Sequence, residues 1–151
     1  DIVASTERIV EIGERGWHDL LDRHDAAMRR QLERFGGREI KTTGDGIVEA
    51  FDAPARAVQC ACAIRDAAAQ LDLAVRVGVH VGEVELRGAD IAGMTVHIAA
   101  RIHALADPGE VLVSRTVVDL VAGSAITFAD RGEHQLKGVP GSWQLFGVTQ
   151  T

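Results

Sequence analysis

The feature that most constrains the fold is a regular exchange between helix-length apolar periodicities and short strand-like runs. Apolar residues between Trp17 and Phe35 recur at three- and four-residue steps, which is typical of one face of an amphipathic helix that ends at Gly36. Residues 38–42 and 47–51 then alternate as two strands joined by a glycine-rich turn. Because helices and hairpins interleave, the pattern predicts an α+β fold with a mixed sheet, and a ferredoxin-like sandwich fits best.

The remaining pattern supports the same architecture. Gly13 and Gly16 are expected to interrupt the first helix, and Ser114 is expected to cap a short helix by its side chain. The predicted elements are a helix at 55–71, a second hairpin around Gly82 formed by 73–81 and 83–86, a loop at 87–90, a helix at 93–105, a strand at 110–113, a helix at 114–121 and strands at 126–131 and 143–148.

Length and charge limit the organisation and the partners. A chain of 151 residues that is 46% hydrophobic suits a single packed domain spanning 1–151. The formal net charge of -6 argues against nucleic acid or an anionic membrane surface as a general partner. We expect a cytoplasmic domain without membrane contact, since no apolar run approaches the ~20 residues of a membrane span and no signal peptide opens the chain. The start at Asp1 suggests a fragment whose first strand is largely missing.

The two cysteines are predicted to have a packing role. Cys60 and Cys62 lie two residues apart in an alanine-rich helical stretch, so they point to different sides of the helix and a disulfide between them is not expected. Neither belongs to a metal-ligand spacing, and free thiols suit a reducing compartment.

Two acids are candidates for holding a hard cation. Asp45 stands between two glycines at the tip of the first predicted hairpin, where its carboxylate is accessible, although solvated turn aspartates are also common there. Asp1 precedes a strand-to-helix connection whose first helical turn offers backbone N–H groups to an anion. Any strand-to-helix connection has this appearance, so each signal is weak by itself.

Other polar residues are also candidates, each with an ordinary alternative. Lys41 lies on the strand that leads to the first hairpin turn, and Asp90 stands where a helix cap is common. His97 and Arg101 are neighbours on one helix face, which is often only a solvated stripe. Lys137 lies in a hairpin turn. No nucleophile elbow, Walker A motif, dinucleotide fingerprint or zinc-ligand spacing is present.

Taken together and in order, these pieces resemble one family. The chain carries DIVAST at 1–6, KTTGDG at 41–46, VRVGVHVGEV at 75–84, DIAG at 90–93 with VHIAAR after it, and a late LKG. This order resembles the catalytic domain of class III adenylate/guanylate cyclases over essentially the whole chain. The short segment between Leu86 and Asp90 is similar to the dimerisation arm of actinobacterial-type members.

The resemblance implies a role for each matching position. Asp1 and Asp45 match the acids that hold two divalent cations, Mg²⁺ or Mn²⁺, with the carbonyl of Ile2 as a further ligand. Lys41 and Asp90 match the pair that reads the purine, in the form that suits adenine. As catalytic residues the family implies Arg101, for charge on the reacting phosphate, and His97, where an asparagine that orients the ribose is usual. The implied phosphate-binding residues are Val3, Ala4, Ser5, Thr6 and Lys137; a phenylalanine is common at the position of Ser5.

The resemblance therefore implies an adenylate cyclase that converts ATP to 3',5'-cyclic AMP and pyrophosphate. It also implies a homodimer whose active sites are shared, with Asp1 and Asp45 from one chain and the purine, ribose and phosphate residues from the other. Two alternatives stay open: a cyclase-like module that binds nucleotide or dimerises with little catalysis, and a guanylate or mixed-specificity cyclase.

Overall fold

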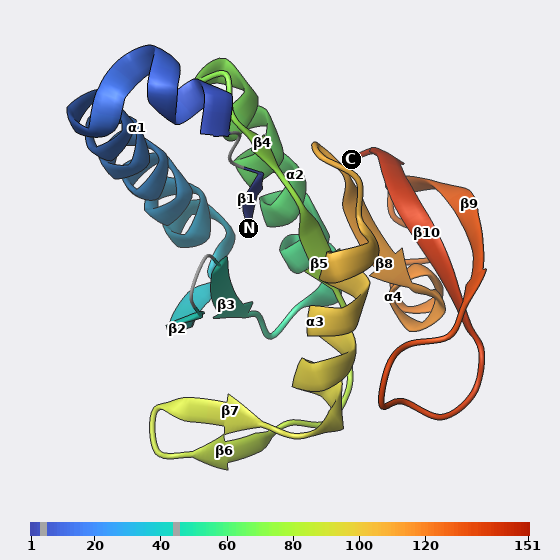
Figure 1. Ribbon diagram of the computed structural model, residues 1–151. Coiled ribbons are helices and arrows are strands. Elements are labelled where there is room, and N and C mark those ends of the chain that lie inside the picture. Colours follow the sequence, from blue (N-terminus) through green and yellow to red (C-terminus); the bar gives the residue numbers. More distant parts are fainter. Residues whose placement is uncertain (4–5, 44–45) are drawn as a thin grey trace.

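The computed structural model describes residues 1–3, 6–43 and 46–151, and it has a mixed α+β architecture, as the sequence predicts (Figure 1). Its helices are α1 (Thr6–Phe35), α2 (Pro54–Gln70), α3 (Met94–Leu105) and α4 (Arg115–Leu120). Its strands are β1 (Ile2–Val3), β2 (Arg38–Thr43), β3 (Gly46–Ala50), β4 (Ala74–Val75), β5 (Val77–Val79), β6 (Glu85–Arg87), β7 (Asp90–Ala92), β8 (Val111–Ser114), β9 (Thr127–His134) and β10 (Trp143–Gln150).

The largest sheet has the strand order β5-β8-β10-β9. The β5–β8 pair is parallel, while β10 pairs antiparallel with both β8 and β9. Within the described residues three two-stranded pairs also form, namely β1–β4 and the hairpins β2–β3 and β6–β7. The sheet is therefore mixed, because hairpins and a helical crossover both occur in the chain.

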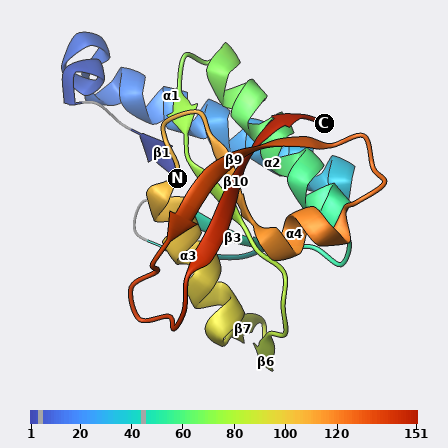
Figure 2. The ribbon, with the colours of Figure 1, turned by 90° about the vertical axis from the view of Figure 1, so that its right-hand side faces the viewer.

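Strand β8 is the centre of the core because it is buried on both faces. Val111 and Val113 point to one face, where they pack with α2 and α4, while Leu112 points to the other, where it packs with Ile98 and Ile102 of α3. Figure 2 shows β9 and β10 in front, with α1 and α2 behind them. A continuous apolar run such as 111–113 suits a strand covered on both sides.

Helices α1 and α2 pack side by side through apolar residues of both (Figure 1). Met28 and Leu32 of α1 contact the cluster that contains Cys60 and Ile64 of α2. The helix is interrupted at Gly13, where φ is 76° and ψ is 168°, but it continues through Gly16, so the expected second interruption is wrong.

The cysteines have the packing role that the sequence predicts. Cys60 and Cys62 are free, and their exposed fractions are 0% and 2%. Burial raises the pKa of the Cys60 thiol to about 12 and also raises the pKa of Cys62. Both thiols are therefore protonated at neutral pH and chemically inert.

The predicted position of the second hairpin, around Gly82, is wrong. Strand β5 does not turn back at Gly82; it pairs in parallel with β8. The hairpin forms later in the chain, between β6 and β7, around a turn at Gly88 (φ 63°). Residues 87–90 were predicted as a loop, but Arg87 ends β6 and Asp90 begins β7. Residues 77–79 are held by β8 because the buried sheet offers them a partner that local sequence does not reveal.

The start of the chain forms a strand where the sequence predicted only a strand's end. Ile2 and Val3 pair antiparallel with Val75 and Ala74 of β4. The pairing extends by two backbone hydrogen bonds, from the Asp1 nitrogen to the Arg76 carbonyl (2.7 Å) and from the Arg76 nitrogen to the Asp1 carbonyl (2.8 Å). This strand places Asp1 against the sheet.

Ser114 stands at the N-cap of α4 but makes no side-chain cap hydrogen bond, contrary to the sequence prediction. Its Oγ lies 2.7 Å from Nδ1 of His80, and it is fully buried. Burial lowers the pKa of His80, whose ring also meets Trp143 edge-on at a centroid distance of 5.5 Å. A buried hydroxyl needs a partner, and the neutral imidazole supplies one.

The placement of α3 depends on the missing side chain of Gly78. A Cβ there would lie 2.5 Å from the backbone nitrogen of His103 and 2.8 Å from the carbonyl oxygen of Ala99. We predict that Gly78→Ala lowers the free energy of unfolding by about 1–3 kcal/mol, because backbone on both sides must move. Urea denaturation measures this, with Gly16→Ala as the control: its Cβ would contact only Ile12 and should be tolerated. Equal stability of the two variants would contradict this packing.

Glu49 makes stability depend on pH. Burial, with the opposing Glu39 on β2, raises the pKa of Glu49 to about 7. The folded chain then holds a proton more tightly than the unfolded chain, so the free energy of unfolding falls as pH rises from about 4.5 to about 7. We predict that Glu49→Gln is more stable than the wild type at pH 8, by on the order of 2 kcal/mol, with the difference vanishing below about pH 4.5. The exposed Glu33→Gln is the control, and a parallel pH profile for both variants would refute the assignment.

Candidate functional site

Lys41 and Asp90 meet in the structure although 49 residues separate them. The Lys41 Nζ lies 3.0 Å from Oδ1 and 3.3 Å from Oδ2 of Asp90, and the backbone nitrogen of Ile91 donates to Oδ1 at 2.8 Å. These bonds lower the pKa of the Asp90 carboxyl, chiefly through Lys41. The Lys41 and Asp90 side chains are 39% and 51% exposed. A cation and an acceptor are thus presented together at an accessible place.

Helix α3 presents different residues on its two flanks. Ile98 and Ile102 face the sheet and are nearly fully buried. At about 100° per residue, His97 and Arg101 lie on one flank of this buried stripe, and His103, about 200° from Arg101, lies on the other. The helix therefore lies between the groups that contact His97 and Arg101 and the groups that contact His103.

Lys137 lies in a tight turn beside that first flank. The nitrogen of Val139 donates to the carbonyl of Leu136 at 2.9 Å, and Gly138 has a φ of 79°, as the third position of a type II turn requires. The Nε2 atom of His97 lies 3.1 Å from the Lys137 carbonyl oxygen. A hollow of about 540 Å³ is lined by this segment, from Gln135 to Val139 with Gly141.

Arg101 follows His97 by one helical turn on this flank of α3, and Lys137 lines the hollow. Among the residues that the structure describes, neither Arg101 nor Lys137 forms an ion pair. In a chain of net charge -6, each of these two cations favours the approach of an anion.

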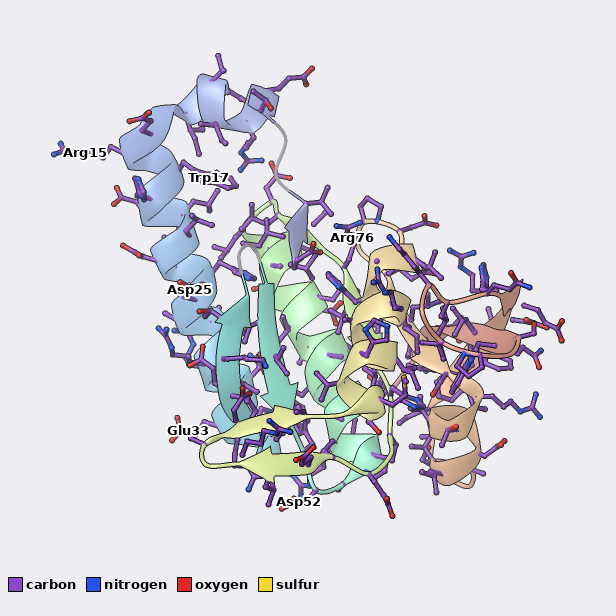
Figure 3. The ribbon with its side chains drawn as sticks, turned by 60° about the horizontal axis from the view of Figure 1, so that its bottom comes forward. Arg15, Trp17, Asp25, Glu33, Asp52 and Arg76 are labelled. Atoms are coloured by element: carbon purple, nitrogen blue, oxygen red, sulfur yellow. The ribbon has the colours of Figure 1, made fainter. Side chains whose placement is uncertain are left out.

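Asp1 lies on the other flank of α3 and is nearly buried, with 3% of its side chain exposed. Arg76 donates two hydrogen bonds to the Asp1 carboxylate, from Nη2 to Oδ2 at 2.7 Å and from Nε to Oδ1 at 3.1 Å. The Nε2 of His103 lies 3.0 Å from Oδ1. Figure 3 shows Arg76 beside β1 and α3. A carboxylate held in this way is charge-balanced by the protein itself.

The remaining predicted site residues are those that follow Asp1 in the chain and Asp45 in the first hairpin. Ile2 and Val3 belong to β1, and Thr6 begins α1. Ala4, Ser5 and Asp45 lie outside the described residues, although the β2–β3 hairpin that carries Asp45 has the predicted form, with Thr43 paired to Gly46.

The donor chemistry at Asp1 suits a hard cation, because its carboxylate and the carbonyl of the adjacent Ile2 are oxygen ligands. Within ranges 1–3, 6–43 and 46–151, no group of three or more His, Cys, Asp or Glu is gathered for a metal. A divalent cation at Asp1 would compete with Arg76 for the same oxygens. The described residues are compatible with such an ion if it replaces Arg76 as the partner of the Asp1 carboxylate.

Arg76 and His103 were not identified as site residues from the sequence. The sequence shows Arg76 only as a charged residue within a strand-like run; its pairing with Asp1, 75 positions away, is a tertiary contact. No signal existed for His103 either, because its contact with Asp1 depends on how α3 crosses β5.

Comparison with known proteins agrees with this fold. The family model described as the adenylate and guanylate cyclase catalytic domain matches residues 1–150. A Rhizobium meliloti (strain 1021) protein named "Putative adenylate cyclase 3" is 37% identical over 142 residues, which cover 87% of this chain and 24% of that protein. The chain thus spans about a quarter of the length of this relative.

Solved structures give the same result. An adenylate/guanylate cyclase/hydrolase from Silicibacter pomeroyi superposes with a TM-score of 0.84 at 27% identity, covering 100% of this chain and 93% of that one. The adenylyl cyclase CyaB from P. aeruginosa has a TM-score of 0.85 at 23% identity, covering 100% and 91%. The fold is that of the class III nucleotide cyclases. The chain belongs to the class III adenylate/guanylate cyclase catalytic-domain family.

Throughout the described residues, the helices are too short or too polar to cross a bilayer.

The Asp1–Arg76 pair generates a stability prediction. Arg76→Met leaves a nearly buried carboxylate without its main partner, so we predict a loss of about 3 kcal/mol in the free energy of unfolding. The double variant Asp1→Asn/Arg76→Met should recover much of this loss, because both charges are then gone. Arg38→Met is the control, since Arg38 faces a 96% exposed Asp52 at 3.9 Å. Additive losses in the double variant would show that the pair is not coupled.

Proposed function

We propose that this chain is the catalytic domain of an adenylate cyclase, which converts ATP to 3',5'-cyclic AMP and pyrophosphate as a cytoplasmic homodimer. The observation that carries the proposal is the ion pair between Lys41 and Asp90, which brings a hydrogen-bond donor and an acceptor together at an accessible place. It rests also on membership of the cyclase family.

The Lys41–Asp90 pair suits adenine better than guanine. On its pairing edge adenine presents a ring nitrogen that accepts and an exocyclic amine that donates. A lysine donates to the first and an aspartate accepts from the second. Guanine presents the reverse on that edge, an oxygen that accepts where adenine has its amine and a ring N–H that donates. The carboxylate would then face an oxygen and the ammonium would face a donor, which costs binding free energy.

The unpaired cations suit the triphosphate. Arg101 would stabilise charge that develops at the α-phosphate, and Lys137 would hold the terminal phosphates. In the reaction the ribose 3'-oxygen attacks the α-phosphorus, the bond to pyrophosphate breaks, and the hydroxyl proton passes to water or to a substrate phosphate. Mg²⁺ or Mn²⁺ ions, held by Asp1, Asp45 and the Ile2 carbonyl, would supply charge neutralisation and a lowered hydroxyl pKa.

The geometry of α3 supports a shared active site. Asp1 contacts the flank of α3 that carries His103, while His97 and Arg101 occupy the opposite flank. Asp1 and Arg101 of one chain therefore lie on opposite sides of the helix and its buried stripe, which favours a partner chain as the source of the arginine. A symmetric dimer brings the Asp1 side of one chain to the Arg101 side of the other, which gives two equivalent sites.

The nucleotide assay is the first test. Purified homodimer with ATP or GTP, and with Mn²⁺ or Mg²⁺, is expected to form cyclic AMP and markedly less cyclic GMP. Liquid chromatography of the products measures both. A preference for GTP would make the chain a guanylate cyclase, and no cyclic nucleotide with any combination would make it a binding or dimerisation module.

Mixing inactive variants tests the shared site. Asp45→Ala and Lys41→Ala damage opposite halves, so a heterodimer of the two has one intact site and one doubly damaged site. An equal mixture that exchanges freely is expected to recover about a quarter of wild-type activity, since half of the dimers are mixed and each has one working site of two.

The matched control mixes Asp45→Ala with Asp1→Ala. Both changes damage the same half, so every site in every dimer lacks one acid and activity should stay absent. Recovery in the control, or none in the first mixture after exchange is verified by a tag pull-down, would refute the shared-site arrangement.

A further inference from the structure

The imidazole of His97 makes a hydrogen bond with the turn that carries Lys137. Its Nε2 lies 3.1 Å from the Lys137 carbonyl oxygen, across 40 residues of sequence. A carbonyl only accepts, so this bond requires the proton of the ring on Nε2. The ring thus joins α3 to the turn at the backbone of Lys137 itself.

The surrounding turn is built to receive this contact. A Cβ on Gly138 would lie 3.1 Å from Nε2 of His97, so a side chain there would crowd the imidazole. Gly138 also has a φ of 79°, a conformation that other residues rarely adopt. Both properties of this glycine favour a close approach of the ring to the backbone.

Besides the turn hydrogen bond from the Val139 nitrogen to the Leu136 carbonyl, two side-chain contacts restrain the segment on its flanks. Leu136 is 3% exposed and packs in the cluster of Ile98 and Ile102, while Nε1 of Trp143 donates to the Pro140 carbonyl at 3.2 Å. Neither acts on Lys137, whose side chain is exposed and makes no ion pair among the described residues.

We propose that His97 is a positioning residue, which fixes the backbone of Lys137 so that the ammonium group is held toward the terminal phosphates of the nucleotide. The proposal rests on the proposed function, because it assigns Lys137 its ligand. It departs from the role that the family resemblance implies for this position, which is a direct contact to the ribose. The side chain acts through Lys137.

Two conservative substitutions separate these roles. The amide nitrogen of glutamine reaches about where Nε2 of histidine lies, whereas that of asparagine reaches only about as far as Nδ1. If His97 holds the turn, His97→Gln should retain more activity with ATP than His97→Asn, and His97→Ala should lose about five- to tenfold in kcat/KM, the effect of one hydrogen bond. If the residue contacts the ribose, as the usual asparagine does, His97→Asn should be the better variant, and this order would overturn the proposal.

A double-mutant cycle identifies the partner. When Lys137→Ala is already present, adding His97→Ala should cause no further loss in kcat/KM, because the turn no longer carries the ammonium group. Losses that multiply would show that His97 acts independently of Lys137 and would overturn the proposal.

Hydrogen exchange measured on the protein without nucleotide supplies a readout that does not depend on catalysis. His97→Ala and His97→Asn should speed exchange at the Val139 amide, which is bonded to Leu136, while His97→Gln should slow it back toward the wild-type rate. Exchange in β8 (Val111–Ser114) is the control and should not change. An unchanged rate at Val139 in His97→Ala would overturn the contact. If the wild type forms no cyclic nucleotide, the proposed function fails, whereas the exchange rates still decide whether His97 holds the turn.

Discussion

The packing of α3 against the sheet is the constraint on which the rest of the site depends. Gly78 lets the helix backbone come within contact of β5, and Ile98 and Ile102 lock it over Leu112 of β8. Once this orientation is set, the helix has one flank facing the turn of Lys137 and another facing Asp1. The site residues on both flanks are therefore held by one buried interface, and a shift of α3 would disturb all of them together.

Charge balance within the chain explains how the nearly buried carboxylate of Asp1 is tolerated without a bound cation. Asp1 is held by Arg76 and lies 3.0 Å from His103, so the folded protein compensates its charge without an added ion. On the other flank, Arg101 and Lys137 have no acidic partner among the described residues, and Lys41 is paired with Asp90. The distribution thus leaves a compensated carboxylate on one flank of α3 and cations without described acidic partners on the other. This separation supports the proposal of a dimer in which each site takes groups from both chains.

Much of the fold could be predicted from local pattern. The helical periodicity up to Phe35, the hairpin at 38–50 and the helix from Met94 to Leu105 are all present, because amphipathic spacing and glycine turns act over a few residues. The parallel pairing of β5 with β8 and the true position of the second hairpin were missed, since strand partners far apart in the chain leave no local signal. The sequence predicts Ser114 as a side-chain helix cap, yet in the folded chain its hydroxyl lies within hydrogen-bond distance of His80.

The sequence by itself determined the family and the set of residues available for chemistry, because the ordered motifs around Asp1, Lys41, Asp90, Arg101 and Lys137 are specific in combination. Only the tertiary structure decided which of these residues meet. It joined Lys41 to Asp90 and His97 to the backbone of Lys137, and it surrounded Asp1 with Arg76 and His103. Such contacts depend on the angle and depth at which helices cross strands. That geometry is set by the whole core at once and is not encoded in any single segment.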